Sequence, residues 1–214
     1  MMMKIRREEI TVEELLRRYA AGERDFPRVD FTGKREFTGV DLSGINLSGS
    51  NLRAANFEGT NLTEANLSGS NLRAADFERT NLTRANLSEA KLEGAVIDNA
   101  ILIEANLQDA SLEGILNSDL RRANLERIDM LEARIENCNL EGASLRGAIL
   151  GDMGIVGCNL RYANLEGIEG QIELSDVDLT GAVGFDPMIC GLGYWNLTFP
   201  DGSFVADWQG KYIP

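Results

Sequence analysis

A period of five residues runs through most of this chain and restricts its fold more than any other feature. Residues 47–66 and 67–86 agree at 17 of 20 positions, and a shorter unit repeats every five residues within each block. All 15 residues at every fifth position from Leu42 to Leu112 are Leu, Phe or Ile. The residues two places earlier are small or β-branched, and the residue between is usually Asn or Asp. The chain is therefore built mainly from one internal repeat.

The spacing within each unit predicts a very short strand followed by a sharp turn. Two apolar positions separated by one residue lie on the same side of an extended segment, while the Asn or Asp between them points the other way. The other two residues are polar or Gly, as in Ser48-Gly49 and Glu58-Gly59, which is typical of turns. A helical reading fails because five residues do not match a period of 3.6.

The near-duplication over 20 residues indicates that four units complete one coil. Coils stacked by parallel hydrogen bonds at about 4.8 Å place residues 20 apart above one another. Phe37, Phe57 and Phe77 would then form one interior column, which Ile97 continues. No proline occurs between Pro27 and Pro187, as an unbroken ladder requires.

These units resemble the repeats of pentapeptide repeat proteins. The similarity covers roughly residues 25–184 and includes the Ala-Asn-Leu triplets at 65–67, 85–87 and 105–107. It implies an all-β solenoid, namely a right-handed quadrilateral parallel β-helix, and the coil length then predicts about seven to eight coils. The stretch from Glu14 to Phe26 also resembles the lead-in of cyanobacterial members.

The five-residue register slips near residues 31–37, 112–120 and 165–174. Successive apolar positions are six, eight and nine residues apart there. Insertions in solenoids form surface loops, and such loops can bind partners. A tolerated bulge or a bend is the alternative interpretation of each slip.

Both ends of the chain leave the repeat and are expected to cap the stack, whose end coils would otherwise expose apolar surface and strand edges. Residues 1–24 predict an N-terminal capping helix, in which Thr11 and Glu14 have the spacing of a capping box. A partner-binding helix is the alternative. Residues 185–214 predict a C-terminal cap, and a site for a sugar ring or partner, or a dimer contact, is the alternative. This tail contains half of the aromatic residues: Phe185, Tyr194, Trp195, Phe199, Phe204, Trp208 and Tyr212.

The chain is acidic, with 34 Asp and Glu residues against 21 Lys and Arg, a net charge of -13 and no histidine. The lack of histidine excludes Ser-His-Asp and Cys-His catalysis and histidine metal sites. The negative charge argues against direct nucleic-acid binding and against an anionic membrane surface. The excess is concentrated in residues 101–184, which carry 15 acidic and 6 basic residues.

Stacking at 20-residue intervals sorts many of these charges into columns. Alternating signs suit a solvated ladder and are predicted for Glu64–Arg84–Glu104, Arg121–Glu141–Arg161 and Glu126–Arg146–Glu166. Runs of one sign would suit a mimic of DNA phosphates and are predicted for Glu58–Glu78–Asp98, Glu93–Glu113 and Glu132–Asp152. The family resemblance adds weight to the second possibility, because members that resemble quinolone-resistance factors are proposed to act on DNA gyrase in this way.

No catalytic, cofactor-binding or metal-binding site is recognisable in the sequence. Cys138 and Cys158 occupy small inward positions 20 apart, so we expect two stacked buried thiols, although ladder spacing would also permit a disulfide. Cys190 lies in the tail, where it can be exposed, without a neighbour that would activate its thiolate. Asp176 and Asp178 do not match a calcium-binding loop.

We therefore predict a non-enzymatic scaffold that presents flat faces to an unidentified protein partner. It would need no cofactor and would act as a monomer or an end-to-end dimer. The alternatives are a DNA-mimic regulator of a type II topoisomerase (gyrase) or of another DNA-binding protein, and an enzyme that uses carboxylates near residues 112–120. The sequence has neither the apolar region of a signal peptide nor an apolar run of membrane-spanning length, so a cytoplasmic location is expected.

Overall fold

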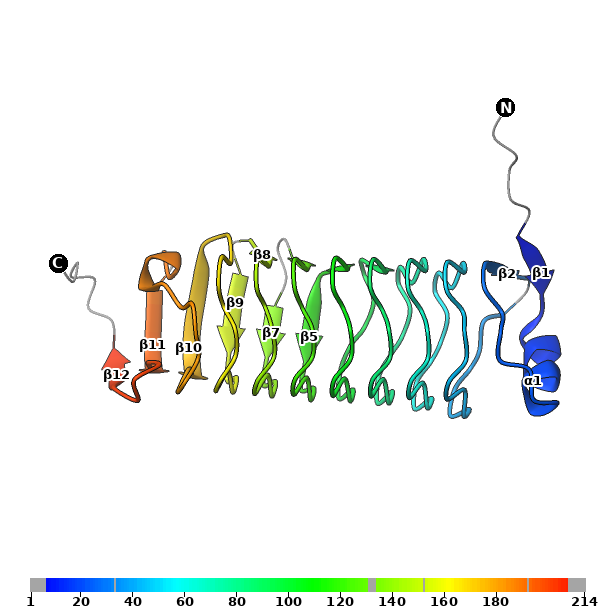
Figure 1. Ribbon diagram of the computed structural model, residues 1–214, viewed down its shortest axis with the longest axis horizontal. Coiled ribbons are helices and arrows are strands. Elements are labelled where there is room, and N and C mark those ends of the chain that lie inside the picture. The colour runs from blue at the N-terminus through cyan, green and yellow to red at the C-terminus, as the bar shows by residue number, and fades with distance from the viewer. Residues whose placement is uncertain (1–6, 33, 131–133, 152, 192, 208–214) are drawn as a thin grey trace, which may run out of the picture.

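The computed structural model is an elongated β-solenoid of about nine turns (Figure 1). It describes residues 7–32, 34–130, 134–151, 153–191 and 193–207. The solenoid predicted from the five-residue period is confirmed, whereas the prediction of about seven to eight coils is too low, because strands of both end segments join the stack. Parallel strands also stack beyond residues 25–184, because β1 (Glu8–Ile10) pairs with β2 (Val29–Phe31) and the tail contributes β11 (Gly193–Thr198).

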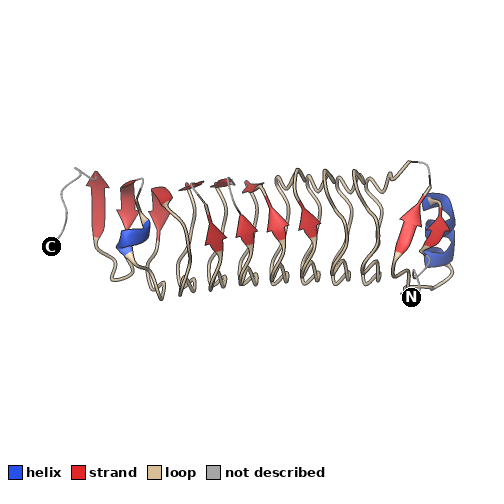
Figure 2. Ribbon diagram, turned by 90° about the horizontal axis from the view of Figure 1, so that it is seen from above, coloured by secondary structure: helices blue, strands red, loops and turns tan. Residues whose placement is uncertain are grey.

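Most coils are joined by isolated parallel bridges, and longer strands concentrate in the C-terminal half (Figure 2). One sheet has the order β3-β4-β6-β8 and another has the order β12-β11-β10-β9-β7-β5. The first sheet contains β3 (Lys91–Leu92), β4 (Ser111–Leu112), β6 (Asp129–Met130) and β8 (Ile149–Leu150). The second adds to β11 the strands β5 (Gly114–Leu116), β7 (Arg134–Glu136), β9 (Met153–Val156), β10 (Ile172–Asp178) and β12 (Phe204–Asp207).

Each five-residue unit forms the strand and turn that its composition predicts, as the unit at residues 61–65 illustrates. The Leu62 N–H donates to the Asn81 carbonyl of the next coil at 2.7 Å, and the Ala65 N–H donates to the Leu62 carbonyl at 3.0 Å. Glu64 has a φ of 59°, as the third position of a type II turn requires. The Asn61 side chain accepts from the Thr63 N–H at 3.1 Å and thereby supports the turn.

The interior is a stack of apolar side chains with a few buried hydroxyls. The Phe37 and Phe57 rings stack at 4.9 Å between centroids, and the Phe57 and Phe77 rings at 5.2 Å, which confirms the predicted column. Buried Ser and Thr residues in the small inward positions remain hydrogen-bonded, as polar groups in a core must. For example, the Thr80 hydroxyl donates to the Phe57 carbonyl at 2.7 Å.

Four inward columns define four faces of the solenoid, and we name each face after one member. The Leu42 face continues through Leu62, Leu82, Leu102, Leu120, Leu140 and Leu160; the Leu47 face through Leu67, Leu87, Leu107, Leu125, Leu145 and Leu165. The Leu52 face continues through Leu72, Leu92, Leu112, Met130 and Leu150; the Phe57 face through Phe77, Ile97, Ile115, Ile135, Ile155 and Leu174.

All three register slips fall at one corner, between the Leu52 face and the Phe57 face. At each slip, the sequence separation between paired residues of neighbouring coils is larger before this corner than after it. It falls from 21 to 20 at the first slip, from 20 to 18 at the second and from 20 to 19 at the third. The pairs that show it are Asp30–Asn51 and Glu36–Asn56, Lys91–Ser111 and Asp98–Leu116, and Ile149–Glu169 and Ile155–Leu174. The first slip therefore adds one residue to the corner, whereas the second and third remove two residues and one.

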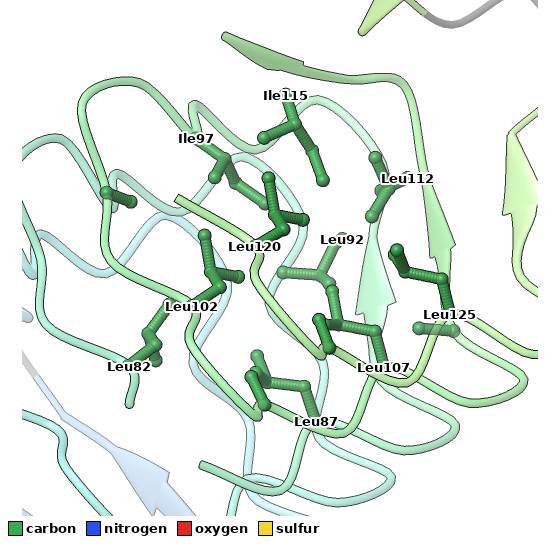
Figure 3. Packing of buried hydrophobic residues seen from close by; sticks show 14 of the residues in the cluster. Leu82, Leu87, Leu92, Ile97, Leu102, Leu107, Leu112, Ile115, Leu120 and Leu125 are labelled. Carbon is green, nitrogen blue, oxygen red and sulfur yellow. The ribbon is translucent and has the colours of Figure 1, made fainter. Parts of the chain in front are cut away.

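The second slip is a shortened corner and contains no inserted loop. Ile115 is fully buried and points into the core beside Ile97 (Figure 3), so it fills an inward position that the sequence interpretation did not assign. Leu112 and Ile115 are three residues apart instead of five. At the third slip, Gly170 takes the place below Leu150 in the stack. A Cβ atom on Gly170 would lie 1.4 Å from the Leu150 carbonyl oxygen, so the tightened corner requires glycine here.

The predicted N-terminal helix is α1 (Val12–Ala20), which lies at one end of the solenoid (Figure 1). The Thr11 hydroxyl caps it by accepting from the Glu14 N–H at 3.1 Å. The Glu14 carboxylate binds Arg17 at 2.7 Å. Leu15 is fully buried, and the Tyr19 hydroxyl donates to the Ser43 carbonyl at 2.8 Å, so the helix is tied to the first coils.

The C-terminal tail adds one parallel and one antiparallel strand to the stack. Strand β11 pairs with β10 in parallel, and β12 then turns back along β11. Tyr194 is buried, and its ring meets that of Phe199 edge to face at 5.6 Å. Phe204 is exposed, while Trp208 and Tyr212 lie outside the described residues. A short 3-10 helix, Pro187–Ile189, precedes β11.

Candidate interaction surface

The outward side chains beside each inward column form flat faces, and on the Leu42 face the charges alternate. Arg84 pairs with Glu64, as predicted. Glu104 pairs with Arg122 at 3.5 Å, because the shortened corner makes this coil 18 residues long. Arg121 stacks in register with Glu141, as predicted, and its guanidinium also binds Asp119 of its own turn at 2.7 Å. The predicted alternation is therefore preserved, and Arg122 and Asp119 supply further ion pairs that the prediction did not include.

The Leu47 face repeats this arrangement. Arg146 pairs with Glu166 at 3.3 Å, as the predicted column requires, and Arg127 binds Asp109 at 2.8 Å. The two Arg127 hydrogen bonds hold the pKa of the Asp109 carboxyl below its ordinary value. Shallow hollows of about 320 and 360 Å³ on the Leu42 and Leu47 faces are lined by side chains of both signs. Exposed pairs of this kind stabilise the fold only weakly.

The predicted acidic columns are only partly continuous. Arg79 pairs with both Glu78 and Glu58 on the Phe57 face and so neutralises the lower part of one column. Glu93 pairs with Arg73 at 2.8 Å. The third predicted column, Glu132–Asp152, lies outside the described residues. The run of like charge that a phosphate mimic would favour is therefore interrupted by arginine.

The shortened corner at the second slip produces a hollow of about 440 Å³ beside the Phe57 face. We call it the notch. In regular coils the small residue two places before each inward residue of this face is fully buried, as for Ala55 and Ala75. Ala95 occupies the same position but is only partly buried, because the coil above it lacks two residues. The notch is lined by Gly94, Ala95, Val96, Ile97, Asp98, Glu113, Gly114, Leu116 and Arg134.

Apolar side chains replace polar ones at the notch. The outward position before the inward column holds Asn56 and Asp76 in the preceding coils and Val96 at the notch. The outward position directly after the inward residue changes in the same way, because Leu116 stacks on Asp98 of the preceding coil. Val96 and Leu116 are 49% and 37% exposed, so neither is needed for the core.

The three cysteines are buried free thiols. Cys138 and Cys158 stack as predicted, and the Cys138 N–H points at the Cys158 sulfur at 3.4 Å. The neighbouring Cys158 sulfur and burial raise the pKa of Cys138. Cys190 is 6% exposed, so the sequence interpretation that allowed an exposed thiol is wrong. Burial, with the nearby Asp186, raises the pKa of Cys190 to about 12, which leaves it protonated and unreactive.

The remaining candidate residues have structural roles. Asp176 accepts from the Asn196 side chain of the next coil at 2.8 Å. Asp178 accepts from the Thr180 N–H at 2.9 Å and pairs with Arg161 at 3.3 Å. In the described ranges, no group of three or more Cys, Asp or Glu side chains is placed to hold a metal ion. Within the same ranges, no helix is long and apolar enough to span a bilayer.

Comparison with known proteins identifies the repeat. The family described as pentapeptide repeats matches in eight copies over residues 41–79, 60–97, 80–115 and 117–152. Alr5209, a pentapeptide repeat protein from Nostoc PCC 7120, is 35% identical, with 56% of this chain and 84% of that chain covered and a TM-score of 0.25. No curated protein matches the sequence.

Two further solved structures are similar. HetL, a pentapeptide repeat protein involved in the regulation of heterocyst differentiation in the cyanobacterium Nostoc sp. strain PCC 7120, is 29% identical. The match covers 91% of this chain and 99% of HetL, with a TM-score of 0.49. QnrB1, a plasmid-mediated fluoroquinolone resistance protein, is 18% identical, with 73% of this chain and 85% of that chain covered and a TM-score of 0.52. At this identity the likeness to QnrB1 shows a shared fold.

Proposed function

Because the chain belongs to the pentapeptide repeat family, we propose that it is a non-enzymatic scaffold that presents the faces of its solenoid to a protein partner. The observation that carries the proposal is the outer surface. Regular columns of outward side chains cover long flat faces, and the Leu42 and Leu47 faces carry only shallow hollows with charges of both signs. Such a surface offers area and a charge pattern for recognition.

The surface offers little support for catalysis. Enzyme sites combine a concave pocket with titratable groups whose pKa values are strongly perturbed. The carboxylates whose pKa values are lowered accept hydrogen bonds in turns or from arginine, as for Asp41 with Ser43 and Asp109 with Arg127. The carboxylates near residues 112–120 are Glu113, which is exposed, and Asp119, which binds Arg121.

A capture experiment with one variant for each face tests the scaffold. The immobilised full chain is exposed to lysate from its source, and bound proteins are identified by mass spectrometry. Besides wild type, the baits are four single variants, which change exposed or half-buried charges on the Leu42, Leu47, Leu52 and Phe57 faces: Arg122→Glu, Arg127→Glu, Arg73→Glu and Glu78→Lys.

We expect a reproducible partner that one of these variants loses and the other three retain, because a docked face is sensitive to a reversed charge. Repeated capture of nothing specific would contradict the proposal. Equal capture of the same proteins by all five baits would indicate binding that uses no face.

The alternative of a DNA mimic that regulates gyrase has less support, since Arg79 and Arg73 interrupt two of the predicted acidic columns. A supercoiling assay tests it directly. A DNA mimic should inhibit or protect gyrase at micromolar protein, whereas a scaffold for another partner should leave supercoiling unchanged.

A further inference from the structure

We propose that the notch is the docking site for a protein segment that carries an aliphatic side chain next to Lys or Arg residues. The inference rests on the proposed scaffold function and names where the partner binds and what chemistry it presents. Three independent properties of the notch support it, namely its shape, its apolar wall and its unpaired charge.

The shape results from the chain itself. The corner between Leu112 and Ile115 is two residues shorter than a regular corner. The side chains that a regular corner would place over Ala95 are therefore absent, and the wall of the solenoid is recessed there. The resulting volume of about 440 Å³ exceeds that of the hollows on the Leu42 and Leu47 faces. It is large enough to receive a Leu, Ile or Met side chain together with its flanking backbone.

The apolar wall of the notch consists of side chains at outward positions that are polar in the preceding coils. Val96 and Leu116 stand where the preceding coils carry Asp76 and Asp98 in the same columns. Each is exposed by more than a third, so the core gains little from its apolar character. Together with Ala95 they form an apolar surface inside a recess, which an aliphatic side chain would cover favourably.

The rim is negatively charged. Asp98 accepts a hydrogen bond from the Asn117 side chain at 2.7 Å, and Glu113 is exposed; neither forms an ion pair with any described residue. The nearby arginines are already engaged, since Arg134 binds Glu136 at 3.3 Å and Arg79 binds Glu58 and Glu78. A partner with Lys or Arg beside its aliphatic residue would therefore match the rim, and an acidic partner would be repelled.

A peptide selection on the full chain tests the proposal. A random peptide library displayed on phage is selected on the wild-type protein and then depleted on the double variant Val96→Ser/Leu116→Ser. Both side chains are exposed in part, so the variant should keep its circular dichroism spectrum and urea midpoint. Ile101→Ser is the matched control, because Ile101 is 41% exposed on a different face.

We expect the surviving peptides to carry Leu, Ile, Val or Met flanked by Lys or Arg. Their affinity should fall about ten-fold on the double variant and stay unchanged on Ile101→Ser. Asp98→Asn/Glu113→Gln should weaken the same peptides by about three-fold at low salt and less at high salt. Peptides that bind wild type and double variant equally, or survivors without basic residues, would overturn the proposal.

Two further results separate the notch from the scaffold function. If the protein sediments as a dimer that Val96→Ser/Leu116→Ser dissociates, a second copy covers the notch and the proposed occupant is wrong. If a partner captured from lysate binds the double variant as well as wild type, the notch is not its docking site while the scaffold proposal stands. Loss of that partner on the double variant, with retention on Ile101→Ser, would support both.

Discussion

Replacing Phe57 by leucine tests how much the aromatic column contributes to the stack. Phe57 is fully buried, with the Phe37 ring 4.9 Å away on one side and the Phe77 ring 5.2 Å away on the other, at interplanar angles of 10° and 12°. Leucine occupies most other inward positions, so the backbone accepts it. The change removes two aromatic pairs, each worth about 0.5–1.5 kcal/mol beyond area burial. We expect Phe57→Leu to lower the free energy of unfolding by about 1–3 kcal/mol.

Phe77→Leu is the matched control, because Phe77 stacks on one aromatic ring and has Ile97 in the next coil. It loses one aromatic pair with the same change of volume, so it should be less destabilised than Phe57→Leu by about 0.5–1.5 kcal/mol. Urea unfolding followed by far-ultraviolet circular dichroism measures both, provided that the m-values agree. The double variant should fall short of the sum by a similar amount. Equal destabilisation of the two single variants, or strict additivity, would refute the reasoning.

Further predictions concern the core, the tightened corner, one surface pair and the thiols. Leu67→Asp should lower the free energy of unfolding by about 4 kcal/mol or more, because a charge cannot be paired in so narrow a core; a variant as stable as wild type in urea would contradict the inward assignment. Gly59→Ala, with φ of 63° and open space around its Cβ position, should cost about 1–2 kcal/mol in urea unfolding, whereas Gly170→Ala, whose Cβ would also collide with the Leu150 carbonyl, should cost about 3 kcal/mol or more. Arg127→Ala should slightly lower stability at neutral pH. The depressed pKa of Asp109 contributes stability above its ordinary pKa of about 4, so the difference from wild type should vanish as the pH falls through the folded pKa. A thiol reagent should react slowly with the native protein and label all three cysteines after unfolding in denaturant; rapid labelling of any thiol in the native protein would contradict their burial.

The fold follows from the sequence wherever the five-residue unit is regular. The column Phe37–Phe57–Phe77, the turns and the stacked thiols of Cys138 and Cys158 all result from one spacing repeated over many coils. Each local preference agrees with its neighbours, so the pattern has one structural solution. The α1 helix was also predictable, because Thr11 supplies the hydrogen bond that its N-terminus requires.

The notch was not predictable because it depends on which residues are missing. An interval of eight residues between Leu112 and Leu120 is compatible with an inserted loop or with a second inward residue, and only the stacking of Ile115 on Ile97 decides between them. The charge pairs of the next coils depend on the same choice. Glu104 pairs with Arg122 because of the missing residues, and regular 20-residue stacking does not predict this pair.

The contacts of side chains at turns could not be predicted from 20-residue stacking either. Arg79 reaches both Glu58 and Glu78, because a long guanidinium side chain on a turn can contact two coils at once. The burial of Cys190 depends on where the tail folds over the last coil, and the tail has no repeat from which its path could be deduced.

The confinement of all three length changes to one corner has a consequence for engineering this molecule. At the other three corners of the solenoid, successive inward residues stay five residues apart in every coil. Each inward and outward position on these faces therefore stacks on its equivalent from one coil to the next. The corner between the Leu52 and Phe57 faces has accepted one residue more, two fewer and one fewer without ending the stack. A peptide tag or a binding loop grafted at this corner should therefore leave the stacking on the remaining faces unaltered.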